Sequence, residues 1–237
     1  MTALSVNINK IALIRNSRGG NMPNVLQIAL DCEKFGAQGI TVHPRPDERH
    51  IRYADVPELK KHISTELNVE GYPSDSFIDL VTKVKPAQVT LVPDPPEALT
   101  SNAGWDTVKH KDFLQSVTKK LQSANIRVSI FVDPNISFIK NAHELGANRI
   151  ELFTEPYALQ FNEDKHSAIQ KFAEASKFAH SIGLGINAGH DLNLENLHFF
   201  YTNIPFLDEV SIGHALISDA LYFGLEQTIK KYRKQLQ

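Results

Sequence analysis

The chain has 237 residues, and 42% of them are hydrophobic, which is enough to bury a large core. Its 25 basic and 27 acidic residues give a formal net charge of −2, whereas a general nucleic-acid binder would carry a basic excess. No apolar run reaches the roughly 18 residues of a membrane span, and the N-terminus lacks the apolar core of a secretory signal. The single cysteine, Cys32, excludes an intrachain disulfide and fits a reducing compartment. We therefore expect a soluble cytoplasmic protein with no nucleic-acid or membrane partner.

The first half of the chain alternates short apolar runs with helical patterns. Strands are predicted at residues 4–8, 40–42, 67–70 and 87–92. Helices are predicted at residues 23–35, after Asp55 as N-cap, and from residue 73 to Pro86. Residues 15–20 have the composition of a loop. Residues 93–107 form a long loop, and loops of this length in compact domains are usually functional.

The second half continues the same alternation. Strands are predicted at residues 127–132, 149–153, 184–188 and 206–212. Helices are predicted around residues 113–121, at 136–145, at 162–182 and at 194–201, with a loop at 154–161. A last helix is predicted to begin at His214. Its inward-facing side is expected to carry Leu221, Leu225, Thr228 and Tyr232.

This order of elements predicts a (β/α)8 barrel formed as a single domain over residues 1–237. Strict alternation of strand and helix requires parallel strands with right-handed crossovers. The alternative is an open doubly wound sheet. That fold usually carries a G-x-G-x-x-G pattern in its first turn, and Arg18-Gly-Gly does not match the pattern.

Polar residues gather where the predicted strands end. In a parallel barrel these ends meet on the face that carries the active site. The set comprises Asn7, His43, Glu70, Asp133, Glu151, Asn187, His190 and His214. His43 could exchange protons near neutral pH, or it could simply cap its strand. Glu70 and Glu151 would be costly in a barrel mouth unless they are proton-active or paired with an arginine.

Two glycine–histidine pairs follow the last two strands. Gly189 lets the backbone approach a ligand closely, with His190 pointing into the mouth of the barrel. Gly213-His214 opens a helix, and the free N–H groups there favour a phosphate. The alternative for each pair is a tight turn with a surface histidine.

The remaining cationic residues favour anion binding over metal binding. Arg18 and Arg45 are candidate phosphate partners, because a guanidinium binds oxyanions with two hydrogen bonds. A metal-dependent barrel would need clustered ligands such as H-x-H on its first strand, which instead offers Asn7 and Asn9. We therefore expect no metal site.

Several motifs extend this picture in chain order over nearly the whole sequence. They are Val6-Asn-Ile-Asn-Lys-Ile-Ala12, Arg15-Asn-Ser-Arg-Gly19, Gly39-Ile-Thr-Val-His-Pro-Arg-Pro-Asp-Glu-Arg-His50, Val69-Glu70, Val92-Pro93, residues 97–100, Asn187-Ala-Gly-His190 and Ile212-Gly-His-Ala215. Together they closely resemble the pyridoxine 5′-phosphate synthase family, the ring-closing enzymes of one vitamin B6 pathway. The long motif after the second strand and the Asn-Ala-Gly-His motif carry most of the resemblance.

The resemblance implies a transferase-type ring-closing enzyme on a (β/α)8 barrel. It would condense 1-deoxy-D-xylulose 5-phosphate with 3-amino-2-oxopropyl phosphate to give pyridoxine 5′-phosphate, inorganic phosphate and water. It also implies a homo-octamer built from dimers and no metal or organic cofactor. By position, His43 and Glu70 match proton acceptors, His190 matches a proton donor, and Glu151 matches a stabiliser of charged intermediates. The residues matching the aminoketone phosphate site are Asn7, Arg18, Asp191, Gly213 and His214, and those matching the deoxyxylulose phosphate site are Arg45, His50 and Thr100.

One pair of residues departs from the family pattern. Many members have Asp-His where this chain has Asn9-Lys10, which leaves details of the deoxyxylulose phosphate site open. Two other functions fit such a barrel. One is a phosphosugar isomerase or epimerase that uses Glu70 and His43 for enolisation, and the other is a non-catalytic protein that binds a phosphorylated metabolite. Residues 47–49 are expected to form a salt-bridged loop.

Overall fold

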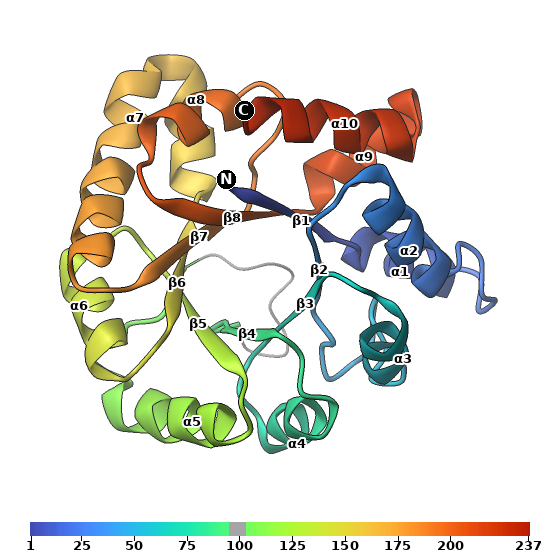
Figure 1. Cartoon of the computed structure of the whole chain (residues 1–237), viewed down its shortest axis with the longest axis horizontal. Helices are drawn as coiled ribbons and strands as arrows, with labels where there is room; N and C mark the ends of the chain where they lie inside the picture. The colour runs from blue at the N-terminus through green and yellow to red at the C-terminus, as the bar shows by residue number, and fades with distance from the viewer. Residues whose placement is uncertain (95–102) are drawn as a thin grey trace.

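The computed structural model describes residues 1–94 and 103–237. In this part of the chain eight parallel strands close into a barrel, and they pair in sequence order, with the last strand returning to the first (Figure 1). The strands are β1 (Ala3–Asn7), β2 (Gly39–Val42), β3 (Glu66–Gly71), β4 (Gln88–Leu91), β5 (Arg127–Val132), β6 (Arg149–Phe153), β7 (Gly185–Gly189) and β8 (Leu207–Ile212). The predicted (β/α)8 barrel is confirmed, and the open sheet is excluded.

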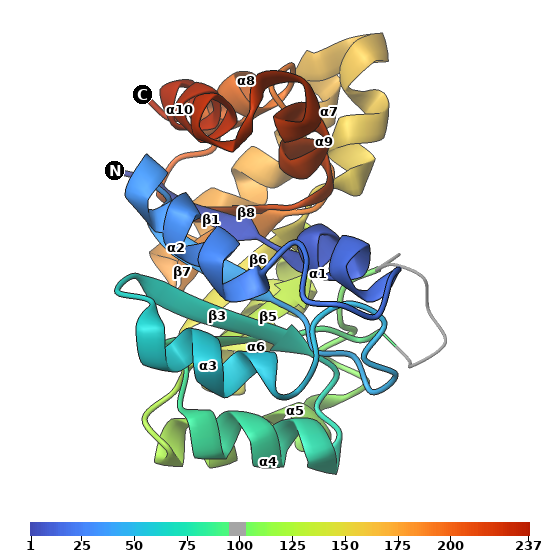
Figure 2. The ribbon, with the colours of Figure 1, turned by 90° about the vertical axis from the view of Figure 1, so that its right-hand side faces the viewer.

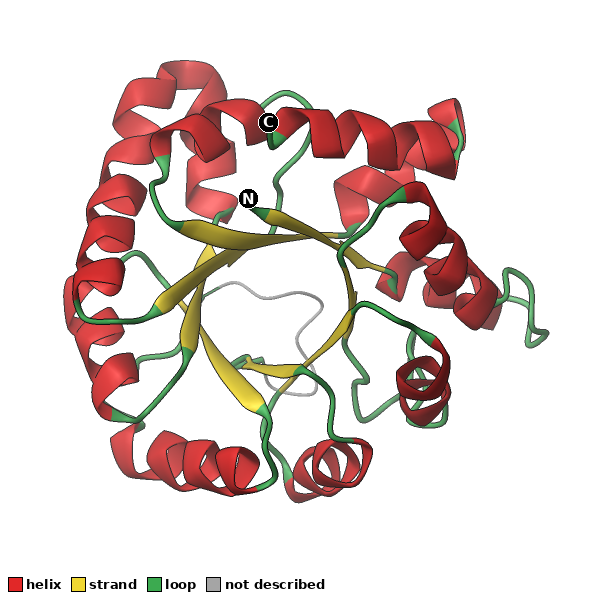
Figure 3. Cartoon of the chain, in the orientation of Figure 1, coloured by secondary structure: helices red, strands yellow, loops and turns green. Residues whose placement is uncertain are grey.

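Helices surround the barrel on its outer side (Figure 3). Those of the described residues are α1 (Asn9–Asn16), α2 (Val25–Phe35), α3 (Asp55–His62), α4 (Asp75–Val84), α5 (Lys111–Ser123), α6 (Ile136–Glu144), α7 (Glu155–Ser181), α8 (Leu197–Asn203), α9 (His214–Phe223) and α10 (Leu225–Gln235). None of them is long and apolar enough to cross a membrane. Seen from the side, α1 lies at the end of the barrel where β3 has its carboxyl terminus (Figure 2).

Local signals in the sequence define several of these helices. Asn24 caps α2 by accepting a hydrogen bond from the backbone N–H of Gln27, and Ser74 caps α4 in the same way. Gly36 ends α2 with a φ of 110°, a left-handed conformation that glycine adopts without strain. The helices cover apolar strand residues such as Val69 and Ile130, which are fully buried.

The inner face of the barrel is mostly polar below Phe131 and Phe153, whereas branched apolar residues fill most (β/α)8 barrels. Thr90 Oγ1 of β4 lies 3.1 Å from the Oδ1 of Asn68 and 3.3 Å from a carboxylate oxygen of Glu151, a contact that crosses the lumen to β6. The buried inward-facing residues include Ser5, Thr41, Asn68, Thr90, Ser129, Glu151, Asn187 and Glu209. Because side chains alternate along a strand, the apolar residues between them face the helices.

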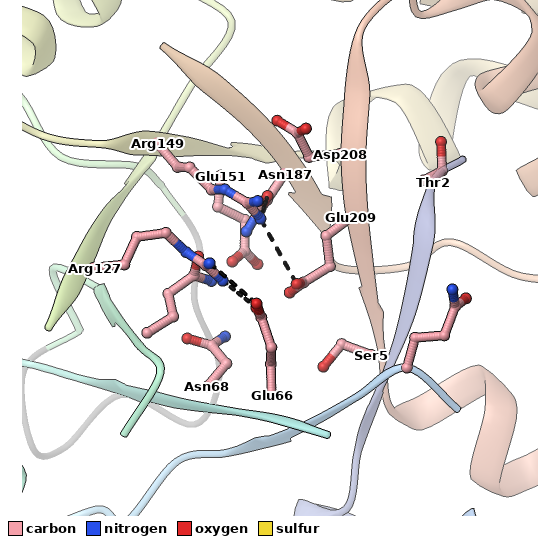
Figure 4. A network of polar contacts seen from close by, with 12 residues as sticks. Thr2, Ser5, Glu66, Asn68, Arg127, Arg149, Glu151, Asn187, Asp208 and Glu209 are labelled. Carbon is pink, nitrogen blue, oxygen red and sulfur yellow. Dashed lines mark hydrogen bonds and ion pairs between the residues drawn. The ribbon is translucent and has the colours of Figure 1, made fainter. Parts of the chain in front are cut away.

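Two arginines lie at the amino-terminal end of the lumen (Figure 4). Arg127 of β5 forms an ion pair with Glu66 of β3. Arg149 of β6 donates a hydrogen bond to Asn187 at 3.1 Å and lies 3.8 Å from the carboxylate of Glu209. Burial raises the pKa of Glu209 to about 7, although the charge of Arg149 opposes the change. Glu209 is therefore a carboxyl group that holds its proton more tightly than an exposed glutamate.

Helix α1 was not predicted, and the predicted loop at 15–20 is wrong for its first two residues, which end this helix. No side chain caps α1 at Ile8, so the sequence lacks the usual start signal of a helix. The predicted N-cap at Asp55 is also wrong, because Ala54 occupies that position. The carboxylate of Asp55 instead pairs with Arg15 of α1, a long-range contact that no local pattern reveals.

The predicted loop at 154–161 is wrong as well, because α7 begins directly after β6. Pro156 lies in its first turn, where a missing N–H group costs nothing. The helix is interrupted at Asp164, whose φ is −152° and whose carboxylate accepts hydrogen bonds from the backbone N–H groups of His166 and Ser167. Asp164 therefore acts as an N-cap for the second part of α7.

The predicted last helix is two helices, because Gly224 separates α9 from α10 with a φ of 75°. The described part of the chain thus has ten helices where eight were predicted. Thr228 and Tyr232 face the core as predicted, but Leu221 is 76% exposed and its inward prediction is wrong.

We expect Glu209→Gln to make the free energy of unfolding less dependent on pH. The native pKa of Glu209 is raised from 4.5 to about 7, so between these values the native protein binds more protons than the unfolded chain. Wild-type stability therefore falls as the pH rises through this window, and the variant lacks that loss. Relative to wild type, its free energy of unfolding should increase by about 1–3 kcal/mol across the window.

Urea unfolding at several pH values measures this difference. Glu66→Gln is the matched control, because a hydrogen bond from Arg127 lowers the pKa of Glu66 and its removal should cost stability near neutral pH. Parallel pH curves for wild type and Glu209→Gln would contradict the prediction.

Candidate active site

A cavity of about 630 Å³ lies at the carboxyl ends of the strands. Side chains that are far apart in the sequence meet here because all strands of the barrel are parallel. The predicted site residues that line it are Asn7, His43, Arg45, His50, Glu70, Glu151, His190, Asp191, Gly213 and His214. The structure therefore brings these residues together in one cavity at the end of the barrel where the strand-end argument placed them.

His43 follows β2 directly and lies in the cavity wall. Its backbone N–H donates to the Oδ1 of Asn9 at 2.9 Å, which ties the end of β2 to the start of α1. Burial, together with the positive charge of Arg45, lowers the pKa of His43 well below its ordinary value. The imidazole is therefore neutral at neutral pH and free to accept a proton.

Two arginines of the segment between β2 and α3 line the cavity. Arg45 is buried and forms an ion pair of 2.7 Å with Asp94, a partner that the sequence did not indicate. The Nε of Arg49 lies 2.7 Å from the carboxylate of Asp47, which confirms the predicted salt bridge in this loop. Two guanidinium groups, each paired with a carboxylate, therefore lie on one side of the cavity.

His50 stands beside His43, with ring centroids 6.1 Å apart. The backbone N–H of Ile51 donates to the Nδ1 of His50 at 2.9 Å, so the proton of the neutral ring is on Nε2. Burial and the charge of Arg45 lower the pKa of His50 to about 4. His50 is therefore a neutral hydrogen-bond donor at neutral pH.

Glu70 lies near the end of β3 and accepts a hydrogen bond from the amide of Asn7 at 3.4 Å. Burial raises the pKa of Glu70 well above its ordinary value, and the charges of Glu151 and Asp94 raise it further. Its carboxylate is therefore a stronger base than that of an exposed glutamate.

Glu151 lies deeper, in β6, and is only 3% exposed. Its side chain lies against the backbone of β7, since a Cβ at Gly189 would stand 2.5 Å from its Oε1. Burial and the charge of Glu209 raise the pKa of Glu151, while the contact with Thr90 lowers it. The result is a carboxyl group that can hold a proton near neutral pH.

The backbone at the end of β7 is strained. His190 and Asp191 have φ values of 87° and 59°, in a region that residues other than glycine rarely adopt. The hydroxyl of Thr154 lies 2.7 Å from the carbonyl oxygen of Gly189 and also contacts that of His190. The Nδ1 of His190 is 2.7 Å from the carboxylate of Asp191, a contact that also lowers the pKa of Asp191. Such strain is often found at functional sites.

The first turn of α9 faces the cavity at Gly213, His214 and Ala215. Gly213 packs against Asn7, because a Cβ at this position would stand 3.1 Å from the Cβ of Asn7. Among the described side chains none caps this helix. Its first N–H groups are therefore available to an anion.

Some predicted residues lie elsewhere. Asn187 lies in the lumen, so its placement at the mouth is wrong. Asp133 directly follows β5 as predicted, but it accepts a hydrogen bond from the backbone of Gly104 at 3.2 Å and does not belong to the described lining of the cavity. Arg18 is exposed after α1 and does not belong to the described lining of the cavity. Thr100 lies outside the described residues.

The cavity also contains polar residues that were not chosen from the sequence, namely Asn9, Lys10, Arg49, Glu155 and Ser211. The polar–apolar alternation of β8 would have placed Ser211 on the inner face. Glu155 carried no signal because its segment was predicted as a loop. In residues 1–94 and 103–237 no three His, Cys, Asp or Glu side chains are grouped as a metal ion would require.

Comparison with known proteins identifies the family. The family model described as Pyridoxal phosphate biosynthesis protein PdxJ matches residues 4–237. The chain belongs to the PdxJ family. Pyridoxine 5′-phosphate synthase of Cytophaga hutchinsonii is 61% identical over 237 residues, covering 100% of both chains. That of Parabacteroides distasonis is 64% identical over 233 residues, covering 98% of each. The resemblance found in the motifs is therefore confirmed.

Solved structures share the fold at low sequence identity. A 3-keto-L-gulonate-6-phosphate decarboxylase from Vibrio cholerae matches with a TM-score of 0.66 at 12% identity, covering 99% of this chain and 97% of its own. A phosphoribosylanthranilate isomerase from Thermotoga maritima matches with a TM-score of 0.59 at 16% identity, covering 100% and 98%. At these identities the likeness concerns the barrel fold alone.

We expect Gly189→Ala to destabilise the protein by about 1–3 kcal/mol, because the new methyl group would overlap the buried carboxyl of Glu151. Thermal or urea unfolding measures the change. Gly20→Ala is the matched control, since no atom lies within 4 Å of a Cβ at that position. Equal stability of the two variants would show that Glu151 does not lie against β7.

Proposed function

We propose that the chain is a pyridoxine 5′-phosphate synthase, the activity for which its PdxJ relatives are named. It condenses 1-deoxy-D-xylulose 5-phosphate with 3-amino-2-oxopropyl phosphate to give pyridoxine 5′-phosphate, phosphate and water. One observation carries the proposal beyond the family match. Proton-exchanging side chains from four different strands or strand ends line a single cavity, namely His43, Glu70, Glu151 and His190.

The reaction requires several proton transfers at different atoms. An amine condenses with a ketone and water leaves, phosphate is then eliminated, and a new carbon–carbon bond closes the ring. Each of these steps moves a proton to or from a substrate atom, so one acid–base group is not enough. The cavity matches this demand, because the pKa values of two imidazoles and two carboxyls in it are shifted, namely those of His43, His50, Glu70 and Glu151.

We assign the proton-transfer roles as the family resemblance suggests, and the electrostatics support them. The lowered pKa of His43 keeps a neutral ring ready to accept a proton, and the raised pKa of Glu70 makes its carboxylate the second acceptor. The Nδ1 of His190, the proposed donor, lies 2.7 Å from the carboxylate of Asp191, a contact that orients the ring. A cationic intermediate beside Glu151 would lower the pKa of this carboxyl, and the ionised carboxylate would in turn stabilise the cation.

Two phosphorylated substrates need two anion sites. We propose that the first N–H groups of α9 hold the aminoketone phosphate, together with Asn7, Arg18, Asp191, Gly213 and His214. Arg18 is included on the family resemblance alone. We propose that Arg45 and His50 bind the deoxyxylulose phosphate. The Nε2 proton of His50 supports this assignment. Thr100 is added to this second anion site on the family resemblance alone.

Asn9 and Lys10, which depart from the family pattern, also contribute to the proposed deoxyxylulose phosphate site. Asn9 accepts a hydrogen bond from the backbone of His43 and so needs no negative charge for that contact. Lys10 lines the cavity and supplies a cation on the side of the deoxyxylulose phosphate. We propose that this pair alters how that substrate is held and leaves the reaction unchanged.

We further propose that residues 1–237 act as one domain in the cytoplasm and assemble as a homo-octamer. The single free cysteine, buried Cys32, fits a reducing compartment. Large apolar side chains of α1 and α9 are exposed and support self-association, namely Leu13, Ile14, Leu221, Tyr222 and Phe223.

Incubation of the purified protein with both substrates tests the proposed reaction. We expect the absorbance of pyridoxine 5′-phosphate to appear only when both substrates are present, with one phosphate released per product. Turnover of a single ketose phosphate without this product would instead favour the isomerase or epimerase. Tight binding of either substrate without any turnover would favour the non-catalytic binder.

Glu70→Gln and His190→Ala should each lower kcat by about 10² or more, because each removes a proton-transfer group. Steady-state kinetics with both substrates measure the loss. Glu144→Gln, which changes an exposed carboxylate on α6, is the control and should keep wild-type kinetics. A loss of less than tenfold in both active-site variants would refute the assigned roles.

A further inference from the structure

A fully buried arginine lies next to the cavity without lining it. Arg15 of α1 is 2% exposed, and its guanidinium binds both carboxylate oxygens of Asp55, at 2.7 and 2.9 Å. The same group donates a hydrogen bond to the backbone carbonyl of His50 at 3.0 Å. Asp55 also accepts a hydrogen bond from the backbone N–H of Arg52 at 2.7 Å. The ion pair therefore joins α1, the start of α3 and the segment between β2 and α3.

Asn16 extends these contacts along the same segment. Its Oδ1 accepts a hydrogen bond from the Nε of Arg15 at 3.0 Å, which orients the side-chain amide. Its Nδ2 then faces three consecutive backbone carbonyls, those of Glu48 at 3.1 Å, Arg49 at 3.2 Å and His50 at 2.7 Å. The backbone of the segment is thus held from α1 at each of these residues.

The held segment carries the cationic side of the cavity. Arg45, Arg49 and His50 all line the cavity, whereas neither Arg15 nor Asn16 belongs to its described lining. The segment contains no helix or strand of its own between β2 and α3, so no regular backbone ladder fixes its shape. Side-chain contacts from α1 must therefore supply the order that hydrogen-bonded backbone supplies elsewhere.

A purely structural role does not account for this arrangement well. A buried ion pair contributes little net stability compared with packed apolar residues of similar volume, because both charges lose their hydration. Its specific effect is geometric, since a guanidinium and a carboxylate with two parallel hydrogen bonds fix one relative orientation. That orientation sets the backbone at His50, a residue that lines the cavity.

We propose that Arg15, Asn16 and Asp55 are positioning residues that hold the anion-binding segment 45–50 in the geometry required by one of the two substrates. The inference rests on the proposed function, in which this segment binds the deoxyxylulose phosphate. It predicts a selective effect on one substrate, because the first turn of α9, the other anion site, makes none of these contacts.

Asn16→Ala tests the proposal without leaving a buried charge unpaired. We expect KM for 1-deoxy-D-xylulose 5-phosphate to rise about tenfold, as small displacements of binding groups commonly cause, while kcat and KM for the aminoketone stay within about twofold. The matched control is Asn141→Ala on α6, whose Nδ2 also donates to a backbone carbonyl, at 3.1 Å, and which should leave both KM values unchanged.

The dissociation constant of 1-deoxy-D-xylulose 5-phosphate alone, measured by calorimetry, separates this proposal from the proposed reaction. Absence of product with wild-type protein would refute the reaction, while weaker binding by Asn16→Ala would still support the positioning role. Unchanged binding, or equal changes in both KM values, would refute the positioning role even if wild type makes pyridoxine 5′-phosphate. Should Asn16→Ala not fold, Asn16→Asp repeats the test, because it keeps the oxygen that binds Arg15 and removes the donated hydrogen bonds.

Discussion

Glu151 and Glu209 are carboxyl groups buried inside the barrel. Their burial constrains which residues can occupy the inner faces of the strands. Each would be costly in an apolar lumen, so the inner faces of the strands supply polar neighbours such as Thr90 and Asn187. Most apolar residues of the strands face outward and pack against the helices. The fold therefore gains its hydrophobic core from the layer between strands and helices, and its lumen is available for polar chemistry.

The same constraint shapes the charge distribution of the cavity. Carboxyl groups with raised pKa values form its floor, and cationic side chains lie on the wall formed by the segment after β2. His43 lines the same cavity, and burial together with the charge of Arg45 lowers its pKa, whereas the pKa values of Glu70 and Glu151 are raised. Neutral imidazoles and carboxyls of raised pKa thus coexist in one cavity, and multi-step proton transfer requires several such groups.

Order at the cavity depends on segments that have no regular structure of their own. The end of β7 is held in a left-handed conformation by Thr154, and the segment after β2 is held by Arg15 and Asn16. In both places a side chain from a neighbouring element binds backbone carbonyl groups. The rigid barrel and helices therefore transmit their geometry to the functional residues through a few hydrogen bonds.

The sequence by itself determined the strand order, the barrel and ten of the 21 described residues that line the cavity. Period-two alternation and short apolar runs mark strands locally, and in a parallel barrel the position of a residue at a strand end is enough to assign it to the mouth. Motifs around His43 and His190 also identified the family. These features depend on neighbours in the sequence, which is why sequence analysis could find them.

Only the tertiary structure decided the contacts between distant segments. Asp55 looks like a helix cap in the sequence, but it is the partner of Arg15, forty positions away. Asp94 pairs with Arg45, and α1 forms without a local capping signal. Burial of an ion pair and the pKa shift of a carboxyl depend on which groups the folded chain brings together, and no local pattern encodes that proximity.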